Sequence, residues 1–110
     1  MEVTIRELGR CTVACFAGRL DAGSVADFDR HLEECVARGT KNLVLDFGAL
    51  GYISSAGLRC VLGAKKRLTS IGGDVAVAGL SGVVKEVFAI SGVDTLLAVK
   101  GTAEEAAAIL

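Results

Sequence analysis

The stretch that decides the architecture of this chain is Gly51-Tyr52-Ile53-Ser54-Ser55-Ala56-Gly57-Leu58. An apolar run at 43–47 precedes it, and apolar residues at helical spacing follow it as far as Ile71. The stretch therefore predicts the junction between a buried strand and a helix. One serine at a helix start accepts a free backbone N–H of the first turn, so a pair of serines leaves one hydroxyl unused. That hydroxyl lies at the positive end of the helix dipole, where a phosphate is tolerated. The pair predicts a switch that responds to serine phosphorylation.

Strand and helix patterns alternate on both sides of this junction. Strand patterns occur at 3–8, 11–17, 42–47, 74–78 and 96–99, and glycines separate the elements. Helices are expected after Ser24, at the pair Ser54-Ser55, after Leu80-Ser81-Gly82 and after Thr102. At Ser24, Asp27 stands three residues on, which predicts an acidic variant of the capping box.

The order of these elements is β-β-α-β-α-β-α-β-α. The first two strands are close enough for a hairpin, and strands separated by helices favour right-handed crossovers. The pattern predicts an α/β fold with a mixed, mostly parallel sheet of about five strands and about four helices. Residues 1–110 are expected to form one domain.

Composition limits the classes of function. The chain has 110 residues, of which 52% are hydrophobic, so one core is expected. Its 12 basic and 13 acidic residues give a net charge of −1, which argues against direct nucleic-acid binding. No apolar run approaches the ~18 residues that cross a bilayer, and the first residues do not resemble a signal peptide. A cytoplasmic protein without membrane insertion is expected.

The cysteines and the histidine do not form a metal-binding pattern. Cys11, Cys15, Cys35 and Cys60 include no C-x-x-C pair, and each lies among apolar neighbours. Free cysteine behaves as a small buried hydrophobe. His31 lies one helical turn before Cys35, but no second cluster completes a site. We expect neither a metal nor a cofactor.

Two kinds of catalytic or nucleotide site are disfavoured by residue type. The G-x-S-x-G elbow of serine hydrolases is absent, because Ile53 stands where the first glycine would be. His31 is predicted on a solvent-facing helix side, with no indication that it reaches the serines. Gly79-Leu80-Ser81-Gly82 lacks the lysine of a phosphate-binding P-loop. The chain is expected not to be an enzyme.

Three segments together resemble a known family. They are Gly18-Arg19-Leu20-Asp21, the strand Leu43-Val44-Leu45-Asp46-Phe47, and the loop Tyr52-Ile53-Ser54-Ser55-Ala56-Gly57-Leu58. In this order and spacing they resemble the STAS domain, and specifically the stand-alone bacterial anti-sigma factor antagonist. The resemblance covers essentially the whole chain. It implies that the unphosphorylated protein binds an anti-sigma factor, often a serine kinase, and so releases a sigma factor. Phosphorylation would break the complex, and a PP2C-like serine phosphatase would restore it.

The phosphorylation loop departs from the family pattern. Many members read D-S-S-G or D-S-T-G where this chain has Ser54-Ser55-Ala56-Gly57. Only the first of the two hydroxyl positions remains, so the resemblance assigns the phosphate to Ser55. Ser54 is the second candidate, or the helix cap.

The expected partner surface combines this loop with acidic residues nearby. Asp46 lies near the end of the expected strand 42–47, and Asp21 lies in the loop after the strand 11–17. As strand ends at the same edge of the sheet, both are expected to lie near the serines. The full set of expected partner-binding residues is Asp21, Asp46, Ser54, Ser55, Ala56, Gly57 and Arg59. STAS domains also serve as accessory subunits of lipid or anion transport systems and of stress-sensing complexes, so that role is the alternative.

Overall fold

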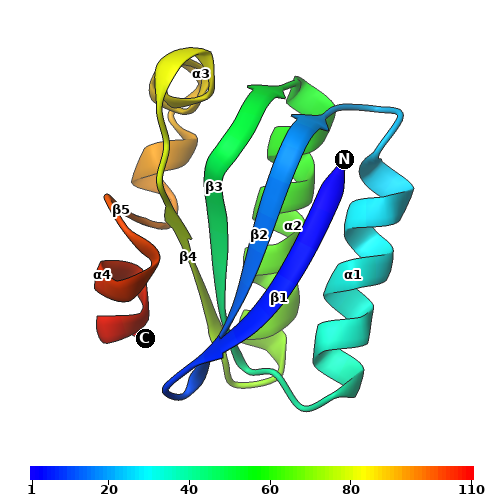
Figure 1. The fold of residues 1–110 in the computed structure, drawn as a ribbon, viewed down its shortest axis with the longest axis vertical. Coiled ribbons are helices and arrows are strands. Elements are labelled where there is room, and N and C mark those ends of the chain that lie inside the picture. The colour runs from blue at the N-terminus through cyan, green and yellow to red at the C-terminus, as the bar shows by residue number, and fades with distance from the viewer.

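The computed structural model describes residues 1–110, and its five strands form a single sheet in chain order (Figure 1). The strands are β1 (Glu2–Leu8), β2 (Cys11–Leu20), β3 (Asn42–Ile53), β4 (Asp74–Ala78) and β5 (Ala98–Lys100). The helices are α1 (Val25–Ala37), α2 (Ser55–Ser70), α3 (Gly82–Ser91) and α4 (Ala103–Ala108), and a 3-10 turn, η1, spans Val93–Thr95. The expected order of elements and the mixed α/β sheet are confirmed. None of the helices has the length and apolar content needed to span a membrane.

Strand direction follows from the connections. β1 and β2 form an antiparallel hairpin in which Leu8 pairs with Cys11 across a two-residue turn. Gly9 has φ of 61°, the left-handed conformation that glycine provides at the first position of such a turn. The pairs β2–β3, β3–β4 and β4–β5 are all parallel, as the helices between them require.

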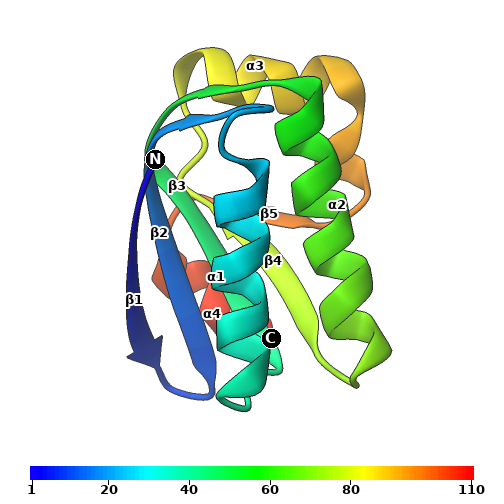
Figure 2. The ribbon, with the colours of Figure 1, turned by 90° about the vertical axis from the view of Figure 1, so that its right-hand side faces the viewer.

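The helices divide unequally between the two faces of the sheet. Figure 2 shows α1 and α2 side by side over one face, whereas α4 lies behind the sheet and α3 crosses its upper end. The larger core lies under α1, α2 and α3 and contains three linked phenylalanine contacts. Phe16 stacks on Phe28 with centroids 5.2 Å apart, and Phe47 lies 5.6 Å from Phe16 and 6.2 Å from Phe88. A smaller core of alanine, valine and cysteine lies under α4.

Several element boundaries differ from the sequence expectation. β2 continues past Ala17 to Leu20, and β3 continues past Phe47 to Ile53. The two strands keep pairing with each other through register shifts near Cys15 and Gly18, so these glycine-containing segments stay in the sheet. The last strand is Ala98–Lys100 and not 96–99, because η1 occupies the chain just before it.

The capping box expected at Ser24 is also wrong. Ser24 precedes α1 but makes no side-chain cap. Its hydroxyl instead accepts the Asp21 N–H at 3.0 Å and donates to the Arg19 carbonyl at 3.0 Å. Ser24 therefore stabilises the loop before α1, because its hydroxyl bonds to the backbone of that loop and not to the helix N–H groups.

The four free thiols predict a loss of stability in alkaline solution. Burial is the main cause that raises the pKa of Cys11, Cys15, Cys35 and Cys60 above the ordinary 9.0. The folded chain thus holds thiol protons that the unfolded chain releases near pH 9. The free energy of unfolding should be unaffected below that pH and should fall as pH rises through it. Urea unfolding at several pH values checks this, and a Cys35→Ala variant should lose less stability over the same range. An identical decline in wild type and variant would contradict the assignment to thiols.

Candidate functional site

The two serines at the start of α2 have different environments. Ser54 is the N-cap residue, with extended backbone, and its hydroxyl accepts the Gly57 N–H at 3.3 Å. Its own N–H donates to the Leu20 carbonyl at 3.0 Å, which ties the start of α2 to the end of β2. Ser55 is the first residue of α2 and is exposed. Since Ser54 supplies the cap, the Ser55 hydroxyl remains available at the N-terminal end of the helix dipole.

Gly57 holds this helix end close to the neighbouring strand. It is buried, and a Cβ added there would lie 2.5 Å from the Leu20 carbonyl oxygen and 2.7 Å from Ile53 Cγ1. Real Cβ atoms do not approach backbone so closely, so position 57 requires glycine for steric reasons. The position of Ser54 and Ser55 relative to the ends of β2 and β3 therefore depends on this contact.

Asp21 lies beside the serine end, as expected. It follows β2 directly, and Leu20 pairs with Ile53, the residue before Ser54. The Asp21 carboxylate accepts the Gly23 N–H at 3.0 Å and the Arg19 Nε–H at 3.4 Å, so it is held within its own loop.

Arg19 and Tyr52 also belong to this end of the molecule, and the sequence prediction did not include them. They are paired across β2 and β3, and the Arg19 guanidinium lies 4.1 Å from the centroid of the Tyr52 ring. This cation–π contact places a positive charge next to the Asp21 carboxylate. The available signal was their position inside the quoted motifs, next to Leu20 and Ile53.

Asp46 does not lie with the serines, so that expectation was wrong. It is an interior residue of β3, paired with Cys15 and Ala78. Between the pair Cys15–Asp46 and the pair Leu20–Ile53, β2 advances by five residues, which is about 16 Å at about 3.3 Å per residue. The Asp46 carboxylate accepts the Gly48 N–H at 2.9 Å, and the Cys15 thiol donates to it at 3.6 Å. The expectation failed because the strand does not end at Phe47.

Ala56 and Arg59 extend the site along the outer side of α2. Arg59 is exposed one helical turn after Ser55. Both residues border a shallow groove between α1 and α2. The lining of this groove comprises Ala22, Val25, Asp29, Ala56, Arg59, Cys60 and Gly63. A partner that contacts Ser55 can therefore also reach a small-residue surface with one charge of each sign at its margins.

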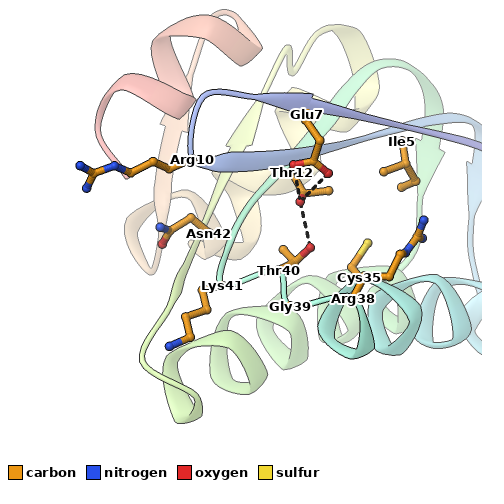
Figure 3. A pocket seen from close by; sticks show the side chains of 10 residues that line it. All are labelled: Ile5, Glu7, Arg10, Thr12, Cys35, Arg38, Gly39, Thr40, Lys41 and Asn42. Carbon is orange, nitrogen blue, oxygen red and sulfur yellow. Dashed lines mark hydrogen bonds between the residues drawn. The ribbon is translucent and has the colours of Figure 1, made fainter.

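A second hollow lies at the opposite end of the sheet, where β2 and β3 begin (Figure 3). At its centre the Thr12 hydroxyl bonds to the Glu7 carboxylate at 3.2 Å and to the Thr40 hydroxyl at 2.8 Å. Arg10 and Lys41 point away from this centre in Figure 3. The polar groups at the centre satisfy one another, so this hollow ties the hairpin to the start of β3.

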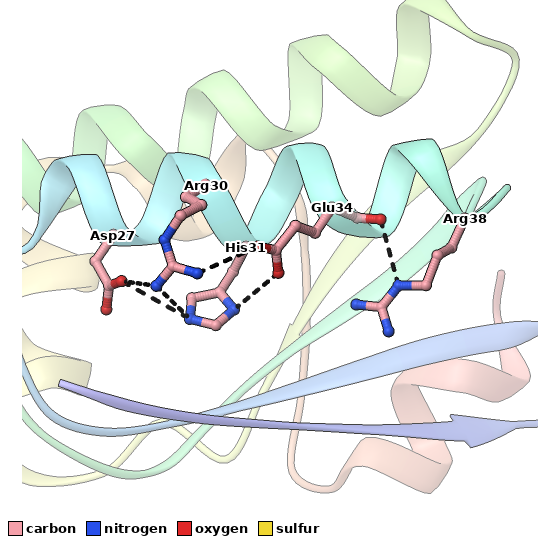
Figure 4. Close-up of polar contacts among 5 residues, drawn as sticks. All are labelled: Asp27, Arg30, His31, Glu34 and Arg38. Atoms are coloured by element: carbon pink, nitrogen blue, oxygen red, sulfur yellow. Dashed lines mark hydrogen bonds and ion pairs between the residues drawn. The ribbon is translucent and has the colours of Figure 1, made fainter.

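His31 is remote from the serines. It projects from α1 on the side that faces β1, between Asp27 and Glu34 of its own helix, each at 3.8 Å (Figure 4). Its side chain is 21% exposed, so it is more buried than the solvent-facing position that the helical pattern predicted. The structure therefore places no histidine base beside the serine pair.

These features define a small α/β protein that presents an exposed serine where a helix begins beside the sheet. The chain belongs to the STAS domain family, which matches residues 2–106, so the expected family is confirmed. It is 36% identical over 108 residues to BtrV of Bordetella bronchiseptica, which is named as an anti-sigma factor antagonist. That match covers 98% of this chain and 93% of BtrV.

Solved structures share the fold. An anti-sigma factor antagonist from Mycobacterium paratuberculosis superposes with a TM-score of 0.87 at 18% identity, covering 98% of this chain and 92% of that one. The phosphorylated form of SpoIIAA, a Bacillus cell fate determinant, superposes with a TM-score of 0.71 at 23% identity, covering 96% of both chains. At these identities the two structures establish a common architecture.

Proposed function

We propose that this protein is an anti-sigma factor antagonist that phosphorylation of Ser55 switches off. The unphosphorylated form binds an anti-sigma factor that is also a serine kinase, and this binding releases the sigma factor. Phosphate on Ser55 ends the complex, and a PP2C-like serine phosphatase restores it. The protein acts in the cytoplasm through protein binding, without catalysis of its own.

The observation that carries this proposal is the division of roles between the two serines. Ser54 accepts the Gly57 N–H, whereas Ser55 is exposed at the first position of α2. A kinase can esterify the Ser55 hydroxyl without removing the helix cap. The near full-length likeness to BtrV supports an anti-sigma factor as the partner.

Charge provides the physical basis of the switch. A phosphate adds about −1.5 to −2 charges at neutral pH. At the N-terminus of α2 this charge is compatible with the helix dipole, so the domain stays folded when it is modified. Asp21 lies on the adjoining loop. A phosphate beside it adds a second, stronger negative charge to the surface that the partner contacts. The switch thus acts on the partner and not on the fold.

The proposed partner surface follows from the positions of the expected residues. It comprises Asp21, Ser54, Ser55, Ala56, Gly57 and Arg59, together with Arg19 and Tyr52. Asp46 is left out, because it lies in the interior of β3, well before the strand reaches the serine end. Gly57 contributes by setting the approach of α2 and not by direct contact, since it is buried.

Phosphorylation by the cognate anti-sigma kinase with ATP should add one phosphate, located at Ser55 by mass spectrometry of peptides. Ser55→Ala should accept none and should stay bound to the kinase. Ser54→Ala is the matched control: it should still be modified at Ser55, while losing about 1 kcal/mol of stability with its cap. Phosphate on Ser54, or unchanged phosphorylation of Ser55→Ala, would contradict the assignment.

A pull-down from the source cells separates this role from that of a transport subunit. The proposal expects recovery of a histidine-kinase-like ATPase, and expects Ser55→Glu to recover much less of it. Recovery of an ABC transporter ATPase, unaffected by Ser55→Glu, would favour the alternative STAS role.

A further inference from the structure

The outer edge of β1 has no strand beside it. β1 is the first strand of the sheet and pairs only with β2 (Figure 1). A two-residue turn makes the flanking pair Leu8–Cys11 a hydrogen-bonded pair, and such pairs alternate along an antiparallel ladder. The N–H and C=O groups of Val3, Ile5 and Glu7 therefore point to the open edge. Such an edge is a template for another strand.

We infer that this edge pairs with β1 of a second copy of the chain, antiparallel and with the two-fold axis at Thr4. In this register Val3 lies opposite the partner's Ile5, and both have outward backbone groups. The two symmetry-related pairs form a main-chain ladder. Glu2 lies opposite the partner's Arg6, so the interface gains two symmetry-related Glu–Arg ion pairs. This inference does not depend on the proposed function.

The burial pattern of β1 agrees with this register. Glu2, Thr4 and Arg6 are exposed on one face, whereas Val3 and Ile5 are half-buried against the larger core. Pairing about Thr4 therefore matches charge with charge on one face and aliphatic side chains on the other. Moving the axis to Ile5 would place Thr4 opposite Arg6 and would lose both ion pairs. Edge charges usually discourage pairing, but here Glu2 of each copy lies opposite the oppositely charged Arg6 of the other.

Neighbouring groups leave room for this pairing. Arg6 has an ion pair with Glu104 at 3.8 Å, and these side chains are 47% and 63% exposed, so the contact is weak enough for Arg6 to turn to a new partner. The side of α1 that faces β1 bears Asp27, Arg30, Glu34 and Arg38 (Figure 4). Arg30 pairs with Asp27 and, at 3.2 Å, with Glu34. This row has two charges of each sign, so two copies brought together at β1 do not repel through it.

The dimer would leave the serine ends free. β1 is at one margin of the sheet, whereas Ser54 follows β3 and caps α2. Each sheet would continue into the other, and each copy would present its own α2 N-terminus.

Sedimentation equilibrium of the untagged full chain over a range of concentrations tests the inference. The mass should rise from the 11.3 kDa of one chain toward twice that value. Glu2→Lys and Arg6→Glu each replace two attractive pairs with two repulsive ones, and each should weaken the dimer by about tenfold or more. Arg10→Glu, in the hairpin turn, is the matched charge change outside the strand and should have little effect.

Mixing the variants identifies the register. In an equimolar mixture of Glu2→Lys and Arg6→Glu, the new lysine faces the new glutamate and the native pair remains at the other position, so the dimer should return. The double variant should also dimerise. Hydrogen exchange should show the Val3 and Ile5 amides protected only at concentrations that form the dimer. A monomer at all concentrations, or a dimer that neither reversal weakens, would overturn the inference; circular dichroism confirms that each variant is folded.

Discussion

Gly57→Ala should destabilise the domain by about 2–3 kcal/mol and displace the serine end of α2. The added methyl would lie 2.5 Å from the Leu20 carbonyl oxygen and 2.7 Å from Ile53 Cγ1. The Leu20 carbonyl also accepts the Ser54 N–H at 3.0 Å, so the helix cannot move away without weakening that bond. Because phosphoryl transfer depends on placement within about 1 Å, phosphorylation of Ser55 should fall by about tenfold or more.

Gly63→Ala is the control on the same helix. A Cβ at position 63 would meet no atom within 4 Å, and the position is exposed. Alanine is favoured over glycine in a helix interior by about 1 kcal/mol, so this variant should be more stable than wild type. Urea unfolding and the kinase assay on both variants make the comparison. Equal stability and equal phosphorylation of Gly57→Ala and wild type would show that the contact with Leu20 is not limiting.

Gly73→Ala should destabilise the domain by about 3 kcal/mol or more. Its Cβ would lie 1.7 Å from the Lys41 carbonyl oxygen and 2.5 Å from the Lys41 carbonyl carbon. That carbonyl accepts the Asp74 N–H at 3.0 Å, where β4 begins to pair with β3. The backbone has to shift by more than an ångström, so the start of the β3–β4 ladder should be lost.

The position of Gly73 gives this prediction a specific signature. It precedes β4, at the end of the parallel strands opposite the serines. Below its lowered unfolding temperature, the folded fraction of Gly73→Ala should therefore be phosphorylated at Ser55 at the rate of wild type. Calorimetry measures the first effect and the kinase assay the second. A normal unfolding temperature, or a specific loss of phosphorylation, would contradict this description of the two ends.

The order of elements could be predicted from local patterns alone. The apolar run at 43–47 predicted a central strand, and β3 is paired on both sides. Ser54 and Thr102 each precede a helix and accept an N–H of its first turn, as their residue types indicated. That one serine hydroxyl is left over also follows locally, because only one of two adjacent serines serves as the cap. These features depend on contacts between residues that are close in the chain.

The rest of the site was decided by contacts between distant segments. The sequence placed Asp46 at a strand end, but pairing with β2 carries β3 on to Ile53, and the carboxylate ends up beside Cys15. Ser24 has the residue type of a cap, yet its hydroxyl bonds to the loop at Asp21 and Arg19.

Sequence therefore determined the strand and helix order and that a serine caps α2, because hydrophobic period and capping act over a few residues. Tertiary structure alone decided where β2 and β3 end and that Arg19 and Tyr52 lie together beside the site. It also explains why position 57 must be glycine. The reason is that strand pairing and steric contact join residues such as Leu20 and Gly57, which no local pattern connects.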